Sequence, residues 1–448
     1  MALSANTVWE VRTDGNDGNG GGFVTGATGT DRSQQAAAQA TLTTASTVGT
    51  TTTQINVAVG DYTVVAGDVG NILQITGGTA TAGFYHITTV DTGNNRWTVD
   101  RAVGTDGQTV AGKMGGAFAS IGTLGAAVIA SPDNTRCYIR SGTYTLTSST
   151  ANVSGGVFAN TVSNDVFILG YDASGGRTSW ATSPLIDVGA ITTITVFDIT
   201  NTAGSNPSIA NVTVDGQLNA NVTGFDIGGG YGQACSCTAI DCTTGFALTN
   251  LGAKAIASKA SGSTTGFSIT SSYGQCIGCW ADSCTNGFST GQGGTMYVSC
   301  LATDCTIGFN NTNSGLFVNC TADGNSGDGF NTPGGGSVLI DCVATNNGGR
   351  GIDINASFTA VIGCATFNNT SGAINAAANG QTNQIGNITL SGDPWVAAAT
   401  DDYRPNAVAG AGALLRVAGL GVVGQTDSRD IGAVQHHDPA RANYRIGV

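Results

Sequence analysis

The chain has 448 residues, a net charge of −13 and only 10% charged side chains. Nucleic acids and anionic membrane surfaces are therefore not expected as partners, because both attract clustered Lys and Arg. No stretch of 18 apolar residues predicts a membrane-spanning helix, and the N-terminus lacks the basic and apolar runs of a secretory signal. With 69 glycines, a single Glu and 40% hydrophobic residues, the composition favours a packed protein made of strands and turns.

The first part of the chain is predicted to hold a leader and an inserted domain. Residues 1–22 form the leader, in which VWEVRTDGNDGNGGG reads as a strand followed by a glycine-rich loop. Residues 23–114 are predicted to form a small β domain, because strand-like runs such as QINVAV and FYHITTV alternate with turn signals such as DTGNN. A short helix is expected at its start, over residues 31–40, with Asp31 as the N-cap.

A short sequence repeat marks the second half of the chain. A glycine followed by a hydrophobic or small residue recurs about every 21 residues, a period that indicates a solenoid. These glycines are Gly224, Gly245, Gly266, Gly287, Gly308, Gly329, Gly351 and Gly372. Few leucines and many glycines argue against leucine-rich and helical repeats, so each unit is predicted to be one coil of a parallel β-helix. Coils of that kind stack about 4.8 Å apart.

In such a solenoid, equivalent residues of successive coils lie above one another in files. The phenylalanines after the repeating glycines are predicted to form an inward aromatic stack: Phe225, Phe246, Phe267, Phe288, Phe309 and Phe330. The glycine before each ring is expected to adopt a positive φ, where a Cβ would clash.

The cysteines follow the same register. One file lies a few positions before the repeating glycines and contains Cys237, Cys279, Cys300, Cys320, Cys342 and Cys364, with Ser258 in its one gap. A second file contains Cys242, Cys284 and Cys305. A buried ladder of reduced thiols is the favoured interpretation. A disulfide framework is more typical of short secreted chains, and a zinc site at Cys276, Cys279 and Cys284 lacks a second pair. No metal or cofactor site is assigned.

Catalytic chemistry is the alternative to a purely structural solenoid. Hydrolysis of a glycoside needs two nearby carboxylates, and Asp282 and Asp304 are placed to neighbour each other on adjacent coils. A lyase-like pairing of Arg350 with Asp328 is also open. Each carboxylate, however, occupies a turn position where Asn also occurs, and Asp stabilises such bends through its own backbone. The remaining coil carboxylates are Asp241, Asp323 and Asp341.

No catalytic residue is assigned from these groups. The adjacent His436 and His437 are interpreted as part of a solvated tail rather than as metal ligands.

The repeat consensus C-x-A-x-(D/N), as in CTAID, CLATD and CVATN, resembles the right-handed parallel β-helix repeat proteins, a superfamily that includes pectate lyases and bacteriophage tailspikes. Residues 115–127 and 134–147 are similar to the opening of that fold, where a short helix caps the solenoid, and residues 393–415 and 430–435 are similar to its closing segment. The resemblance implies an all-β protein with a single-stranded right-handed parallel β-helix over residues 115–375. Regular coils begin at about residue 221, and residues 376–448 form a C-terminal cap and tail.

The resemblance also implies a role. The Thr, Ser, Asn and Gly exterior favours a non-enzymatic structural protein of a bacteriophage virion, a surface decoration or spike on head or tail. The same resemblance implies a homotrimer, assembled in the host cytoplasm with other capsid or tail proteins and attached through the inserted domain. Two alternatives stay open: a tailspike enzyme that degrades polysaccharide as a lyase or glycoside hydrolase, and an adhesin that binds a host surface glycan. Exposure of Trp280 or Tyr297 on one face would favour glycan binding.

Overall fold

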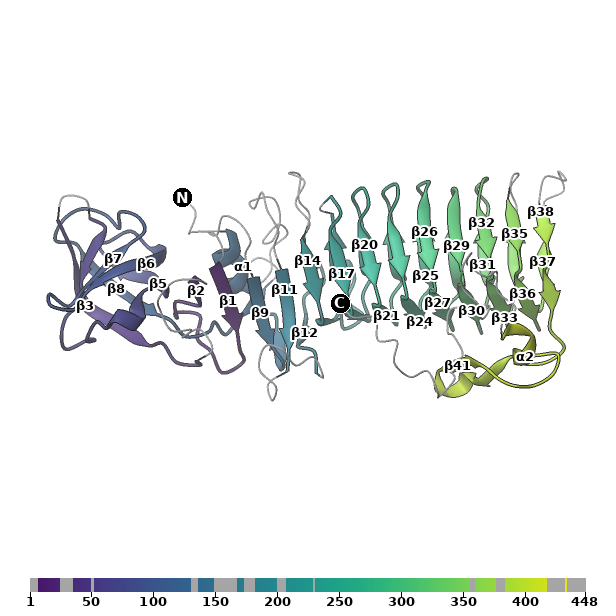
Figure 1. Ribbon diagram of the computed structural model, residues 1–448, viewed down its shortest axis with the longest axis horizontal. Helices are drawn as coiled ribbons and strands as arrows, with labels where there is room; N and C mark the ends of the chain where they lie inside the picture. The colour runs from purple at the N-terminus through teal and green to yellow at the C-terminus, as the bar shows by residue number, and fades with distance from the viewer. Residues whose placement is uncertain are drawn as a thin grey trace, which may run out of the picture. The chain divides into compact units, whose positions relative to one another are not determined.

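The computed structural model describes residues 7–24, 35–49, 52–129, 136–148, 167–172, 182–199, 207–228, 230–354, 359–375, 383–416 and 432. The chain divides into two compact units, Met1–Thr238 and Ala239–Val448, called here the N-terminal unit and the C-terminal unit. Strands dominate both units (Figure 1). Within the described residues no helix has the length and apolar character needed to cross a membrane.

An antiparallel closed barrel occupies the first part of the N-terminal unit. Its strands are joined in the order β3-β4-β7-β6-β5-β8. They are β3 (Ala40–Val48), β4 (Gln54–Asn56), β5 (Ile72–Gly78), β6 (Gly83–Asp91), β7 (Arg96–Val99) and β8 (Thr109–Met114), with a 3-10 turn η1 (Ala66–Asp68) before β5. Trp97 lies fully buried in the barrel core, and its indole N–H donates to Asp68 Oδ2 at 2.9 Å. The small β domain expected in this region is therefore present, and the structure shows that it is antiparallel.

The helix expected over residues 31–40 is not supported by the part of that range that the structure describes. Residues 35–39 are not helical, and β3 already begins at Ala40. The N–H of Gln39 donates to the carbonyl of Met114 at 2.8 Å, so this stretch joins the barrel ladder instead of an internal helical one. Asp31, the expected N-cap, lies outside the described residues.

The rest of the N-terminal unit forms parallel coils. Strand β1 (Thr7–Val11) pairs antiparallel with β2 (Gly22–Val24) and parallel with β9 (Arg136–Arg140). The sheet continues through β11 (Phe167–Tyr171), β14 (Ser208–Ala210) and β17 (Gln233–Cys235). Two further sheets contain β10 (Thr143–Thr145), β12 (Leu185–Asp187) and β15 (Thr213–Asp215), and β13 (Ile194–Asp198) and β16 (Val222–Ile227). Strand β18 (Thr238–Ile240) spans the boundary of the units.

A short helix, α1 (Ile121–Ile129), lies against β1, in the region where the resemblance predicts a cap. The hydroxyl of Ser120 accepts the backbone N–H of Thr123 at 3.2 Å and so satisfies one free amide of the first turn. Asp17 Oδ1 accepts the backbone N–H groups of Ala119 and Ser120 at 2.9 and 2.8 Å. The glycine-rich leader loop thereby fixes the point at which α1 begins.

In the C-terminal unit each coil gives one strand to each of three parallel sheets, within the described residues (Figure 1). Sheet I contains β20 (Lys254–Ile256), β23 (Gln275–Ile277), β26 (Thr295–Val298), β29 (Gly315–Val318), β32 (Val338–Ile340), β35 (Ala360–Ile362) and β38 (Asn383–Ile385). Sheet II contains β21 (Lys259–Ser261), β24 (Trp280–Asp282), β27 (Leu301–Thr303), β30 (Thr321–Asp323), β33 (Val343–Thr345), β36 (Ala365–Phe367) and β39 (Ile388–Thr389). Sheet III contains β19 (Thr244–Leu248), β22 (Thr265–Ile269), β25 (Asn286–Thr290), β28 (Ile307–Asn311), β31 (Phe330–Thr332), β34 (Ile352–Ile354) and β37 (Ile374–Asn375).

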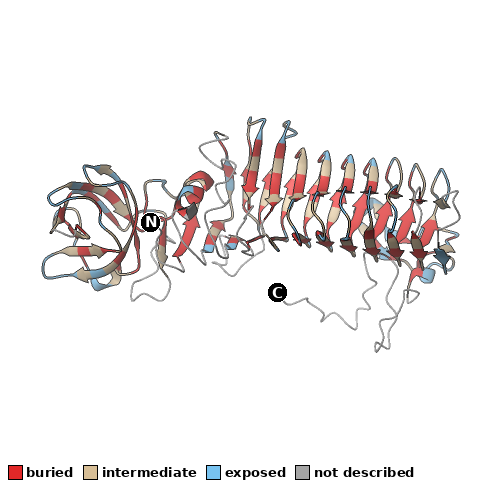
Figure 2. Cartoon of the chain, turned by 90° about the horizontal axis from the view of Figure 1, so that it is seen from above, coloured by how far each residue is buried: buried red, intermediate tan, exposed pale blue. Residues whose placement is uncertain are grey.

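The register of these sheets confirms the predicted parallel β-helix. Phe267 pairs with Phe288, and Phe288 with Phe309, so one sequence repeat corresponds to one coil. The middle residue of the sheet II strands points inward and is Ala in most coils, as in the paired Ala281 and Ala302. Buried and partly buried residues alternate along most of these strands, as the red and tan bands of Figure 2 show.

Single residues in the left-handed conformation turn the chain at the corners of each coil. Between sheets I and II they are Ala257, Gly278, Ser299, Asn319, Asp341, Gly363 and Gly386, with φ between 48° and 65°. After sheet II they are Asp241, Gly262, Ser283, Asp304, Gly324, Asn346 and Asn368, with φ between 50° and 67°. Gly, Asn and Asp tolerate this conformation best, which explains why these residue types recur at fixed spacing.

The glycines that precede the stacked phenylalanines have a different role from the one expected. Gly245, Gly266, Gly287 and Gly308 lie in or beside sheet III strands and do not adopt a positive φ. A Cβ on Gly287 would lie 2.6 Å from the carbonyl oxygen of Gly308 on the next coil. These positions therefore require glycine because neighbouring coils approach closely, and the prediction of a positive-φ turn was wrong for them.

A closing segment covers part of the outer face of sheet II. It consists of β40 (Trp395–Ala397), η3 (Ala398–Thr400), β41 (Asp402–Pro405) and α2 (Gly412–Leu415). Its apolar side chains pack with sheet II in one cluster of Leu301, Val343, Ala365, Leu390, Trp395, Tyr403 and Leu415. This segment, called the cap hairpin below, removes the outward side chains of β27, β30 and β33 from solvent.

Candidate functional site

The aromatic residues singled out from the sequence lie inside the coils. In the C-terminal unit, Phe246, Phe267, Phe288, Phe309 and Phe330 form one stack with ring centroids 4.7–4.8 Å apart and nearly parallel planes. In the N-terminal unit, Phe225 stacks on Phe197 with centroids 5.6 Å apart. These rings are fully buried, so they stabilise the solenoid and do not face a ligand.

A second aromatic pair joins this stack from sheet I. Tyr297 and Phe317 stack on adjacent coils with ring centroids 4.7 Å apart, and their edges meet the sheet III rings at 5.8–5.9 Å. Tyr297 is 1% exposed and therefore offers no surface to a glycan.

The cysteines of both files are buried thiols. Each of the twelve cysteines lies within the described residues, and none of them forms a disulfide. In the first file Cys279, Cys300, Cys320, Cys342 and Cys364 donate S–H bonds to carbonyl oxygens at 3.2–3.7 Å. Burial raises the pKa of Cys237 to about 12, so this thiol is a weak nucleophile. Within the described residues no group of three or more His, Cys, Asp or Glu side chains is arranged to hold a metal ion.

In later coils, asparagine replaces cysteine at the equivalent position of the second file. Asn325 follows Cys305 in register and accepts its backbone N–H at 3.0 Å. Asn325 then donates to Asn347, and Asn347 to Asn369, each at 2.8 Å. A chain of side-chain hydrogen bonds therefore runs parallel to the backbone ladders and ties successive coils together.

Most coil carboxylates singled out from the sequence are bound within or between coils. Asp328 accepts the backbone N–H of Arg350 at 2.7 Å, whereas the Arg350 guanidinium lies 3.6 Å from Asp353. Asp241 and Asp341 occupy left-handed corners, as the interpretation of these residues as turn formers predicts. The lyase-like side-chain pairing of Arg350 with Asp328 is thus replaced by a pairing with Asp353.

Asp323 is bound by three side-chain donors. Its Oδ1 accepts hydrogen bonds from Thr345 Oγ1, from Asn346 Nδ2 at 3.0 Å and from Trp395 Nε1 at 3.1 Å. Burial raises its pKa, although these donors favour the ionised form and oppose the shift. Asp323 therefore joins two coils and the cap hairpin.

The outer face of sheet II carries the arrangement closest to a catalytic site. Asp282, the last residue of β24, lies 3.2 Å from Lys259 Nζ, and that amine also lies 3.5 Å from the centre of the Trp280 ring. Burial raises the pKa of Asp304, and the negative charges of Asp282 and Asp401 add to this rise. Two neighbouring carboxyl groups, one of them with a raised pKa, are one element of an acid and base pair.

Two features of this face limit what it can do. Asp282 also accepts hydrogen bonds from Ser261, Ser283 and Thr303 at 3.2–3.4 Å, so its charge is already balanced by local donors. The Trp280 indole N–H donates to Thr303 Oγ1 at 2.8 Å, and Lys259 covers one face of its ring. Trp280 is thus half-buried and does not offer the open platform that glycan binding would need.

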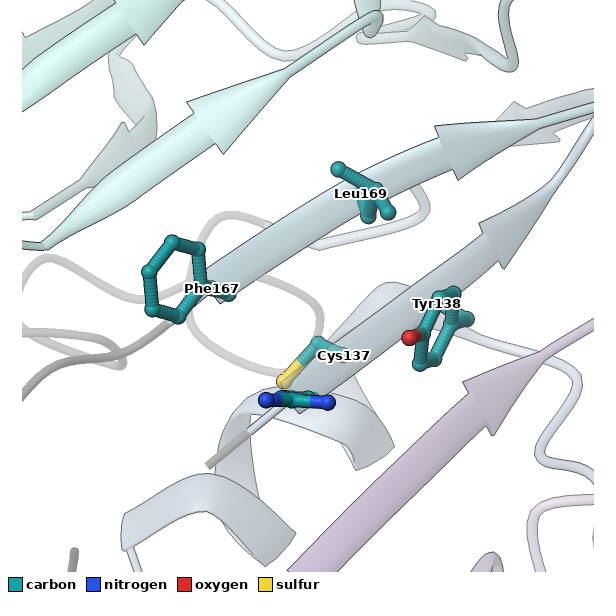
Figure 3. A pocket seen from close by; sticks show the side chains of 5 residues that line it. Cys137, Tyr138, Phe167 and Leu169 are labelled. Atoms are coloured by element: carbon teal, nitrogen blue, oxygen red, sulfur yellow. The ribbon is translucent and has the colours of Figure 1, made fainter. Parts of the chain in front are cut away.

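A pocket of about 210 Å³ opens in the N-terminal unit beside β9 and β11 (Figure 3). It is lined by Arg136, Cys137, Tyr138, Phe167 and Leu169. Register pairs Phe167 with Arg136 and Leu169 with Tyr138 across the two strands. Burial raises the pKa of the Cys137 thiol well above its usual value, so the described lining residues offer a guanidinium and apolar surface but no reactive nucleophile.

The sequence interpretation missed the exposed aromatic residues. Tyr231 in the N-terminal unit and Tyr273 in the C-terminal unit are 60% and 62% exposed, and each precedes Gly-Gln. The repeated triplet YGQ was the available signal, although nothing in the sequence showed that these rings face outward. His436 and His437 lie outside the described residues.

These observations define the chain as a parallel β-helix protein with an inserted antiparallel barrel, whose polar side chains mostly bond one coil to the next. No protein-family model and no curated protein matches it.

Solved structures with a similar fold include the A-module of mannuronan C-5 epimerase AlgE4 from Azotobacter vinelandii, at 14% identity and TM-score 0.40, covering 57% of this chain and 79% of that one. ORF18 of Geobacillus virus E2 matches at 11% identity and TM-score 0.32, covering 57% and 53%. Pectate lyase Pel9A matches at 13% identity and TM-score 0.32, covering 70% and 90%. At these values the likeness concerns the fold alone and carries no argument about activity.

Proposed function

We propose that the protein is a non-enzymatic structural component of a bacteriophage particle, a decoration or spike on the surface of the head or tail. The resemblance of its repeats to tailspike β-helices first pointed to this role. The proposal rests on the observation that coil carboxylates accept hydrogen bonds that join one coil to the next. Asp323 illustrates it, because three donors, two from the next coil and one from the cap hairpin, converge on one oxygen.

A solenoid built in this way suits a surface appendage. Its backbone groups are satisfied between coils, its internal files resist local opening, and its outward residues are mostly small and polar. Such a protein presents few side chains that act as nucleophiles or that react with nucleophiles. Rigidity and inertness are the properties that an exposed particle protein needs.

The assembled form is part of the same proposal. We propose a homotrimer that contacts other capsid or tail proteins through the N-terminal barrel, and that assembles in the host cytoplasm before incorporation into the particle. Sedimentation of the purified chain tests the oligomer, because a trimer has three times the single-chain mass of 44.6 kDa. A monomeric mass at micromolar concentration would contradict the trimer without affecting the structural role.

Purified particles test the role itself. The expected result is a fixed, stoichiometric copy number in intact particles, measured by quantitative mass spectrometry, and a location on the surface by labelling. Absence from washed particles that retain all other structural proteins would overturn the proposal.

A polysaccharide-cleaving enzyme is the second candidate, favoured by one observation. The raised pKa of Asp304, which lies near Asp282, is a property that a general acid requires. Release of reducing ends or unsaturated products from a polysaccharide panel, lost on Asp304→Asn, would establish this function. We expect no release, because Asp282 is engaged by Lys259 and by local hydroxyl groups.

A further inference from the structure

Tyr273 lies at the corner between β22 and β23 and is one of the most exposed aromatic side chains among the described residues. Its exposed fraction is 62%, and its backbone adopts the left-handed conformation with φ of 61°. Leu251, at the same corner of the preceding coil, is 48% exposed.

The conformation of Tyr273 is unfavourable for a bulky residue. The register of sheet I places Gly252, Gly294, Ser314 and Gly336 at the equivalent position of other coils. The three glycines have φ of 72°, 76° and 84°, whereas Ser314 does not adopt a positive φ. Glycine adopts this conformation freely, whereas a side chain with a Cβ is strained. Folding alone therefore favours glycine at position 273, and a retained strained residue is a reason to look for a function.

The ring of Tyr273 packs against the neighbouring coil. A Cβ on Gly294 would lie 2.9 Å from Cδ1 and from Cε1 of Tyr273, so the ring rests against the bare backbone of Gly294. The large exposed fraction shows that the rest of the ring surface faces solvent. Tyr231 in the N-terminal unit repeats the exposure, the left-handed backbone with φ of 66° and the following Gly-Gln.

The side chains near this corner indicate the kind of ligand that it can bind. Residues 249–252, 270–274, 291–294 and 312–314 contain Thr, Ser, Asn, Gln and Gly beside the exposed ring and leucine, and no charged side chain. Lys254, at the start of β20, is the nearest charge along the chain. Hydroxyl and amide groups around an aromatic ring match a ligand with many hydroxyls and an apolar face.

We propose that the Tyr273 corner binds neutral carbohydrate, with the ring as the platform for a sugar and the adjacent hydroxyl and amide side chains as hydrogen-bonding partners. A polyanionic glycan is disfavoured by the net charge of −13. A stable protein partner is disfavoured because one ring and one leucine fall far short of the roughly 1,000 Å² that a specific interface needs. This inference goes beyond the structural role and does not depend on it.

Affinity electrophoresis of the full chain tests the proposal, with the neutral polymers dextran and mannan and the polyanion alginate in the gel. The expected result is retardation by a neutral polymer and at least a tenfold weaker apparent affinity for Tyr273→Gly and Tyr273→Leu. Tyr273→Gly should keep or raise the melting temperature, because glycine relieves the backbone strain. Leu218→Gly is the matched control, because Leu218 is 74% exposed in a left-handed corner with φ of 56° but is not aromatic.

Four outcomes would overturn the proposal. They are no retardation of the wild type by either neutral polymer, stronger retardation by alginate, unchanged binding in both Tyr273 variants, and self-association of the wild type that Tyr273→Gly abolishes in the absence of glycan. None of these results bears on the copy number in particles, so the two proposals fail separately.

Discussion

The indole N–H of Trp395, in β40, donates to Asp323 Oδ1 at 3.1 Å, at the end of β30. The same N–H lies 3.0 Å from Thr345 Oγ1 on the next coil. One side chain of the closing segment therefore bonds to two coils that lie much earlier in the chain. The cap hairpin is held by a polar anchor inside an apolar cluster.

Removing this anchor should loosen the cap hairpin. Trp395→Ala is expected to lower the free energy of unfolding by about 3–5 kcal/mol, the usual cost of deleting a buried Trp side chain. Trp395→Phe keeps most of the packing and loses the hydrogen bond to a carboxylate, so a smaller loss of about 1–3 kcal/mol is expected. Denaturant unfolding measures both, and an unchanged stability of Trp395→Phe would contradict the anchoring role of the N–H.

The aromatic stack should be sensitive at its centre. Phe288 contacts the rings of Phe267 and Phe309 at 4.8 and 4.7 Å, and no part of it is exposed. Phe288→Ala is expected to cost about 3–5 kcal/mol. The control Val396→Ala removes a side chain that is 49% exposed and should change stability by less than about 0.5 kcal/mol. Similar melting temperatures for the two variants would show that the stack contributes little.

The close approach at Gly287 gives a separate prediction. A Cβ there would lie 2.6 Å from the carbonyl oxygen of Gly308, so Gly287→Ala forces adjacent coils apart and should cost about 1–3 kcal/mol. Gly291→Ala is the matched control, because its Cβ would meet nothing closer than 3.8 Å and its φ is not positive. The unfolding midpoints of the two variants test this prediction. An unchanged midpoint for Gly287→Ala would refute the steric explanation.

The buried thiols predict a fall in stability at alkaline pH. The pKa of Cys237 is raised by burial from 9.0 to about 12, so the folded state keeps a proton that the unfolded state loses within this interval. The free energy of unfolding should be fully maintained below pH 9 and should decrease as the pH rises from 9 towards 12. Urea unfolding at pH 7, 9 and 10 measures this slope.

One coil holds serine instead of cysteine in the same file, and this natural replacement suggests the control for that measurement. Ser258 occupies the file naturally and donates to the carbonyl of Ile256 at 3.0 Å. Cys237→Ser should therefore fold and show a shallower alkaline slope, because serine does not titrate in this range. An identical slope in this variant would assign the alkaline loss to other groups.

The periodic part of the chain was predictable because stacking repeats the same environment every coil. Equal spacing of Phe267, Phe288 and Phe309 indicated the paired register that the structure shows. Phe197 was missed because the coil that separates it from its partner Phe225 is longer than the regular repeat. A period can reveal a file only where the loops between strands keep a constant length.

Contacts without a period were beyond the sequence interpretation. The bond between Trp395 and Asp323 depends on how the closing segment folds back, which no repeat encodes. The role of Gly287 was misjudged, since a close approach between coils and a left-handed turn both select glycine. The outward direction of Tyr273 depends on a left-handed corner that a tyrosine alone does not indicate.

The inserted barrel enters and leaves the solenoid at one place. The N–H of Gly20 donates to the carbonyl of Gly115, and that of Gly21 to the carbonyl of Gly116, each at 2.9 Å. The two ends of the barrel segment are therefore fixed beside each other, but β2 pairs with β1 and Phe84 packs on Trp9 within this segment, so an exchanged module would have to keep these contacts. An engineered module that keeps these contacts, such as a reporter domain, can be spliced into the same junction.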